Sequence, residues 1–199
     1  MNEGLICETI AYVQTLFAGN ADGHDADHTM RVYRNAMKLA EKETCDRQIV
    51  ALAALLHDAD DEKLFRTNNN ANARAFLNDR GLREDQIDQI IAVINAVSFR
   101  RNGDKKPDTI EGQIVQDADR LDAIGAIGIA RTFAYGGRHA RGLEDSIRHF
   151  HEKLLLLKDR MNTEAAKKAA EERHLYLLSF LREWDRETEG TEKQKSGTK

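Results

Sequence analysis

Apolar positions recur at helical spacing along most of the chain. Residues 49–56, Ile-Val-Ala-Leu-Ala-Ala-Leu-Leu, present no polar side chain on any face and therefore predict a buried helix. The sequence contains one proline in 199 residues and few β-branched runs, which favours helices almost throughout. We therefore expect an all-α protein with helices over residues 3–18, 26–43, 47–57, 69–80, 84–98, 111–122, 124–135, 143–158 and 163–187.

The length of the chain suits one helical domain, which we assign to residues 1–187. The last helix carries an apolar stripe at Leu175, Leu178, Leu181 and Trp184. This stripe fits the core or a contact with a second copy, so the pattern leaves a homodimer open. Residues 188–199 contain no apolar side chain, and we expect a disordered tail there. Loops are expected at residues 100–107 and 135–142.

Composition and charge narrow the class of protein. No apolar stretch is longer than that from Ile49 to Leu56, so we expect no membrane-spanning helix. The first four residues lack the basic region of a secretory signal, and two cysteines make neither a disulfide framework nor a zinc knuckle. These features favour a cytoplasmic protein. A net charge of −4 argues against nonspecific binding to nucleic acid.

Histidine and aspartate residues gather in three helical segments. His28 shares one helix face with Val32 and Ala36, which points its ring inward. On its own, such a histidine is more often a hydrogen-bonded core residue than a metal ligand. His57 and Asp58 close the apolar helix, and Asp119 is the acid of residues 117–122 best placed to reach the core boundary.

A divalent cation would offset the cost of placing these groups together. An unpaired buried carboxylate is unfavourable, and the C-terminal end of a helix disfavours anions. Two histidines and two carboxylates, without a thiolate, suit one Mn, Mg, Fe, Co or Ni ion in octahedral geometry. Coordination positions filled by water indicate catalysis, because a metal-activated water can attack phosphorus.

The ordered pattern His28 … His57-Asp58 … Asp119 resembles the H…HD…D pattern of the HD superfamily of metal-dependent phosphohydrolases. The surrounding residues extend the resemblance to small bacterial members over about residues 20–185. The segments that carry it are His-Asp-Ala-Asp-His-Thr-Met-Arg-Val at 24–32, Leu-Leu-His-Asp-Ala-Asp-Asp at 55–61 and Gln-Asp-Ala-Asp-Arg-Leu-Asp-Ala-Ile-Gly-Ala at 116–126.

The resemblance implies a single-domain helical bundle with one divalent metal bound by His28, His57, Asp58 and Asp119. It also places Asp61 where some HD nucleotidases have a carboxylate that orients the attacking water. Those enzymes use Glu at this position, and this chain has the shorter Asp. Ala59 and Asp60 follow Asp58, so the chain lacks the HD-GYP pattern of cyclic-dinucleotide phosphodiesterases.

Phosphate groups of a substrate require positive charge near an acidic site. We expect Arg31, Arg120 and Lys153 to supply it, and either Arg131 or Arg138 could replace Lys153. Two further acids lie in the third motif. Asp122 is a candidate for a contact to substrate or to a metal ligand, whereas Asp117 is expected to form a surface pair with Arg120 three residues later.

The leading hypothesis is a divalent-metal-dependent phosphohydrolase that cleaves a P–O bond in a phosphorylated small molecule. The resemblance implies a nucleotide, and both a nucleotide phosphatase and a pyrophosphohydrolase stay open. A metal-activated water would be the nucleophile, and Asp61, or Asp58 in its place, would take its proton. Two alternatives remain: a non-hydrolytic sensor or scaffold that binds metal and nucleotide, and a helical bundle whose His and Asp residues are satisfied core groups.

Overall fold

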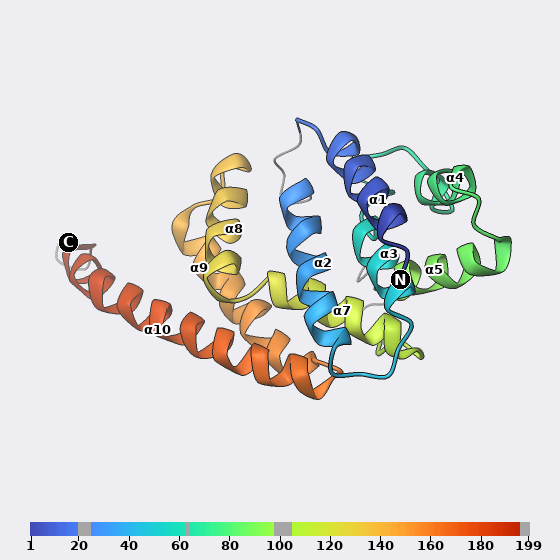
Figure 1. Ribbon diagram of the computed structural model, residues 1–199. Coiled ribbons are helices and arrows are strands. Elements are labelled where there is room, and N and C mark those ends of the chain that lie inside the picture. Colours follow the sequence, from blue (N-terminus) through green and yellow to red (C-terminus); the bar gives the residue numbers. More distant parts are fainter. Residues whose placement is uncertain (20–24, 63, 98–104, 196–199) are drawn as a thin grey trace.

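The computed structural model describes residues 1–19, 25–62, 64–97 and 105–195, with side chains described up to residue 188. All regular structure in these ranges is helical, as predicted (Figure 1). The elements are α1 (Glu3–Leu16), α2 (Ala26–Ala40), α3 (Arg47–Leu56), α4 (Ala71–Asp79), α5 (Glu84–Val97), α7 (Ile110–Asp122), α8 (Gly125–Arg138), α9 (Leu143–Glu152), the 3-10 helix η1 (Leu154–Arg160) and α10 (Glu164–Lys195).

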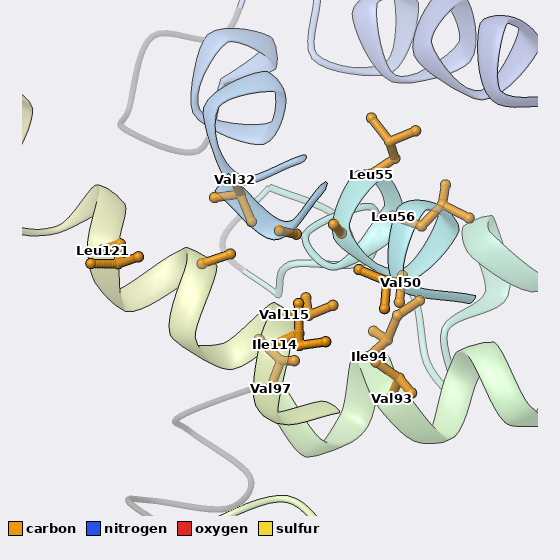
Figure 2. Packing of buried hydrophobic residues seen from close by; sticks show 14 of the residues in the cluster. Val32, Val50, Leu55, Leu56, Val93, Ile94, Val97, Ile114, Val115 and Leu121 are labelled. Carbon is orange, nitrogen blue, oxygen red and sulfur yellow. The ribbon is translucent and has the colours of Figure 1, made fainter. Parts of the chain in front are cut away.

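Helices α2, α3, α5 and α7 pack around the main hydrophobic core, which Figure 2 shows from close by. Helix α1 covers α3, and α10 runs along α7 and α8 toward the far end of the molecule (Figure 1). Every residue of α3 from Val50 to Leu56 is completely buried. Asp46 accepts hydrogen bonds from the backbone of Gln48 and Ile49 and so begins this helix. The prediction of a buried helix is confirmed.

The helix predicted for residues 143–158 is interrupted. Helix α9 ends at Glu152, Lys153 leaves the helical conformation with φ −137° and ψ −56°, and η1 follows. Leu154 and Leu157 are buried three residues apart, which matches the three residues per turn of a 3-10 helix. Periodicity alone did not distinguish this spacing from that of a continuous α-helix.

The loop predicted for residues 135–142 begins later than expected, because α8 continues to Arg138. Two glycines of this helix, Gly136 and Gly128, leave no room for a side chain. A Cβ on Gly136 would lie 2.8 Å from Ser146 Oγ of α9, and one on Gly128 would lie 2.2 Å from the carbonyl oxygen of Ala123. Of the other predicted loop, residues 100–104 lie outside the described residues.

The predicted stripe of the last helix is confirmed at Leu181 and Trp184, which lie in or against the core, but it is wrong at Leu175. Leu175 is 56% exposed, whereas Leu177 and Leu181 are buried together with Ala166 and Ala170 one or more turns earlier. Small alanines mark this face, and the prediction was based on the large apolar residues. The backbone of α10 continues to Lys195, so residues 188–195 of the expected tail extend this helix.

Asp117 occupies the interior, and its predicted place on the surface was wrong. Its side chain is fully buried and accepts hydrogen bonds from the backbone N–H and side chain of both Asn162 and Thr163, at 2.8–2.9 Å. These two residues immediately precede α10. Asp117 therefore binds the start of α10 to the middle of α7, which fixes where the C-terminal helices lie.

Among the described residues, none of the helices combines the length and the apolar character that crossing a bilayer requires.

We expect Asp117→Ala to lower the free energy of unfolding by about 3 kcal/mol, because four donors lose a charged acceptor in the interior. Urea denaturation of the variant and of wild type measures this loss. The matched control is Asp159→Ala, which removes an exposed carboxylate 3.6 Å from Lys158 and should cost much less. Equal losses in the two variants would contradict the role given to Asp117.

Candidate metal centre

Three helix termini meet where the sequence placed the His and Asp residues. His28 lies in the first turn of α2, His57 and Asp58 directly follow α3, and Asp119 and Asp122 lie in the last turn of α7. Helix α2 packs against both α3 and α7, so residues distant in sequence become neighbours. Asp25 begins α2 by accepting a hydrogen bond from the His28 backbone N–H. His24 lies outside the described residues.

The His57 side chain presents an unpaired nitrogen to the cluster. Its Nδ1 lies 2.8 Å from the carbonyl oxygen of Ala54, a contact that favours a proton on Nδ1 and a lone pair on Nε2. Nε2 is buried and, among the described residues, has no hydrogen-bond partner; Asp58 Oδ2 lies 3.3 Å away without hydrogen-bond geometry. A buried nitrogen of this kind requires a partner, and a metal ion would provide one.

His28 is oriented in the same way by a different acceptor. Its side chain is buried, and Nδ1 lies 2.8 Å from Asp122 Oδ2. Nε2 then lies 3.5 Å from both Asp58 Oδ2 and Asp119 Oδ1. One ligand atom each from His28, His57 and Asp119 can be chosen so that all three lie within 4.8 Å of one another. The donor set and its spacing fit a divalent metal with two nitrogen ligands and carboxylate oxygens.

The electrostatics of the cluster also favour a cation. Burial lowers the pKa of His57, but the negative charges of Asp58 and Asp119 outweigh it and raise the pKa to about 9. Burial acts on His28 in the same direction, and its contacts with Asp122 and Asp58 likewise raise its pKa above the usual value. The carboxylates thus create a site that stabilises positive charge.

Asp122 joins the helices around His28. Its carboxylate is 2% exposed and accepts hydrogen bonds from Arg31 of α2, with Nε at 2.7 Å, and from Arg131 of α8, with Nη1 at 2.5 Å. Arg131 Nη1 also lies 3.0 Å from His28 Nδ1; since both nitrogens can donate to Asp122, the carboxylate between them holds this arrangement. Burial alone would raise the pKa of Asp122, but these donors hold it well below its usual range.

Arg131 was predicted from the sequence only as a residue that could replace Lys153 in binding phosphate. The structure places it at the centre, where its guanidinium contacts Asp122. Its position depends on the turn from α7 into α8, which uses a positive φ of 75° at Gly125 and the close approach of Gly128 to Ala123. The closely spaced glycines at 125 and 128 were the only available signal of this turn.

The other predicted residues occupy different surroundings. Arg120 is 8% exposed and donates to the carbonyl oxygen of Arg160, which favours an interior structural role over a substrate contact. Lys153 is exposed at the end of α9. Asp61 is half-buried in the turn after Asp58, where its backbone N–H donates to the Asp58 carbonyl. Asp60 accepts from the backbone of the first turn of α4 and caps that helix.

The geometry agrees with the comparison to known families. Residues 25–124 match the family model described as HD domain. This chain belongs to the HD superfamily. The matched segment contains His28, His57, Asp58, Asp119 and Asp122, which the structure brings together.

Relatives of similar length have solved structures. The uncharacterized protein YpgQ of Bacillus subtilis is 42% identical over 193 residues, which covers 93% of this chain and 94% of YpgQ. A crystal structure of YpgQ in complex with ADP has a TM-score of 0.82 to this chain at 37% identity and covers 92% of this chain and 95% of YpgQ. An HD-superfamily hydrolase from Bacillus thuringiensis has a TM-score of 0.79 at 39% identity, with 94% and 98% covered.

We expect Asp122→Asn to weaken the affinity for Mn²⁺ about ten- to a hundredfold, because the amide cannot accept from His28, Arg31 and Arg131 as the carboxylate does. Isothermal titration calorimetry measures the affinity, and circular dichroism checks that the helices are retained. Asp27→Asn is the matched control, since Asp27 is exposed and adjacent to His28 in the chain. A variant at Asp122 with wild-type affinity would exclude the orienting role.

Proposed function

We propose that this HD protein is a divalent-metal-dependent phosphohydrolase that cleaves a P–O bond of a nucleotide. The observation that carries the proposal is the buried, unpaired Nε2 of His57, which faces the same cluster as His28 Nε2, Asp58 and Asp119. One ligand atom each of His28, His57 and Asp119 lies within 4.8 Å of the others, and His57 Nε2 has no hydrogen bond among the described residues. This convergence favours a metal-binding site over the structural alternative.

His28, His57, Asp58 and Asp119 would hold the metal. When bound, a divalent cation supplies Lewis acidity that lowers the pKa of water and screens the charge of a phosphate. The protein orients both imidazoles from behind, through the Ala54 carbonyl and the Asp122 carboxylate.

Charge beside the cluster suits a phosphorylated substrate. Asp122 carries one negative charge but contacts the guanidinium groups of both Arg31 and Arg131, so these three residues together leave one positive charge. The side chains of the two arginines are 27% and 26% exposed, which leaves part of each accessible from solvent. They would attract the phosphate and hold it at the metal centre.

A carboxylate near the cluster would take the proton of the attacking water. Asp61 is our first candidate, because it lies three residues after Asp58 in the same turn and is half-buried. Asp58 is the second candidate, since its carboxylate lies against both imidazoles. Transfer of this proton makes the water a stronger nucleophile as it approaches phosphorus.

The nucleotide part of the proposal is supported by a relative. The structure of YpgQ in complex with ADP shows that a protein with 37% identity and the same fold was crystallised with a nucleoside diphosphate. A nucleotide also combines the phosphate that the cluster and its arginines favour with an organic group that would occupy the adjacent surface.

Release of phosphate or pyrophosphate from a panel of nucleotides, with Mn²⁺, Mg²⁺, Co²⁺ or Ni²⁺ added, tests the function. We expect metal-dependent release by wild type and its loss in Asp58→Ala, because the variant removes a ligand of the proposed metal. Asp145→Ala removes an exposed carboxylate of α9 and serves as the control that keeps activity. Bound metal without release from any nucleotide would instead favour the sensor.

Asp61→Asn tests the proton acceptor. We expect kcat to fall about 10²- to 10⁴-fold while the affinity for Mn²⁺ stays unchanged, because the amide accepts no proton. Asp61→Glu restores a carboxylate and should recover most of the rate. Steady-state kinetics and calorimetry measure the two quantities. An unchanged kcat in Asp61→Asn would transfer the role to Asp58.

A further inference from the structure

The solvent face of α8 is mostly apolar, with Arg138 exposed at its C-terminal end. Its exposed residues include Ile127 at 43% and Tyr135 at 42%, together with the alanines Ala126, Ala130 and Ala134. The opposite face, with Gly128, Thr132 and Gly136, is buried. The fourteen residues of α8 include no acid, although the chain has 34 acidic residues. An exposed face of this composition is typical of a binding surface.

Arg131 connects this face to the metal centre. Ile127, Arg131 and Tyr135 recur every four residues and so lie along one side of α8. Arg131 reaches Asp122 at 2.5 Å and His28 of α2 at 3.0 Å, which places this side of α8 toward His28. Tyr135 follows one helical turn, about 6 Å along the axis, beyond Arg131.

Tyr135 belongs to a small group of planar side chains. Its ring stacks on His139 with centroids 3.9 Å apart and an interplanar angle of 18°. The guanidinium carbon of Arg141 lies 5.4 Å from the centre of the Tyr135 ring, and Arg141 donates to the carbonyl oxygen of Thr132 at 3.0 Å. These contacts hold the ring in place, and Tyr135 as a whole residue is 42% exposed. A planar aromatic ligand can extend such a stack.

We propose that Tyr135 and the apolar face of α8 bind the base of the nucleotide whose phosphates lie at the metal centre. This inference rests on the proposed function and deepens it by naming the residue that distinguishes a nucleotide from a base-free phosphate. Stacking accepts any base, so Tyr135 selects for an aromatic group and not for a particular nucleotide. The continuity of the face with the metal centre, through Arg131, favours this ligand over a second copy of the chain.

The test compares the affinity of the Mn²⁺-loaded protein for ADP and for inorganic pyrophosphate, measured by calorimetry. In Tyr135→Ala we expect the affinity for ADP to fall about tenfold and that for pyrophosphate to change less than about twofold. Tyr135→Phe keeps the ring and should retain the affinity for ADP. Tyr176→Ala is the matched control, because Tyr176 is a 55% exposed tyrosine on α10.

Four outcomes would overturn the inference. Equal effects of Tyr135→Ala on both ligands would show that the ring does not contact the base. An unchanged affinity for ADP with a lower oligomeric mass, measured by light scattering, would assign the face to a second copy. If wild type binds neither ligand and releases no phosphate from any nucleotide, the proposed function is rejected as well. If Tyr135→Ala hydrolyses nucleotides and keeps full affinity for ADP, only the role of α8 is rejected.

Discussion

The carboxylate of Asp122 is the contact on which the arrangement of the centre depends. It lies at the end of α7 and accepts from His28 and Arg31 of α2 and from Arg131 of α8. A buried carboxylate is stable only with such partners, and here the partners come from both neighbouring helices. The same contacts orient His28 toward Asp119 and place two guanidiniums beside the cluster. The contacts of Asp122 therefore both hold the helices together and orient the groups of the proposed metal centre.

The buried helix α3 supplies the second half of the site. Its apolar residues fix its position in the core. His57 caps the C-terminal end of the helix, and its Nδ1 lies near the Ala54 carbonyl oxygen. The two histidines thus reach the cluster from independent supports, one backbone and one carboxylate. Both contacts direct Nε2 toward the cluster, where His57 Nε2 has no hydrogen bond among the described residues.

The sequence predicted what local patterns determine. Apolar periodicity indicated the helices, and the placement of His28 and His57 at the edge of the core followed from it. The sequence-based prediction was wrong for residues whose position depends on tertiary packing. Asp117 is an ordinary surface acid by its spacing from Arg120, yet the turn before α10 buries it. Arg131 reaches the metal centre because of the turn at Gly125. Apolar periodicity predicts each helix but not the angle between two consecutive helices.

Anomalous diffraction from a crystal soaked in Mn²⁺ shows whether the cluster of His and Asp residues binds a metal ion. We expect one strong anomalous peak at ligand distance from His28 Nε2 and His57 Nε2, with carboxylate oxygens of Asp58 and Asp119 completing the protein ligands. The absence of a peak at this position, or a peak held by other residues, would contradict the assignment of the cluster as a metal centre.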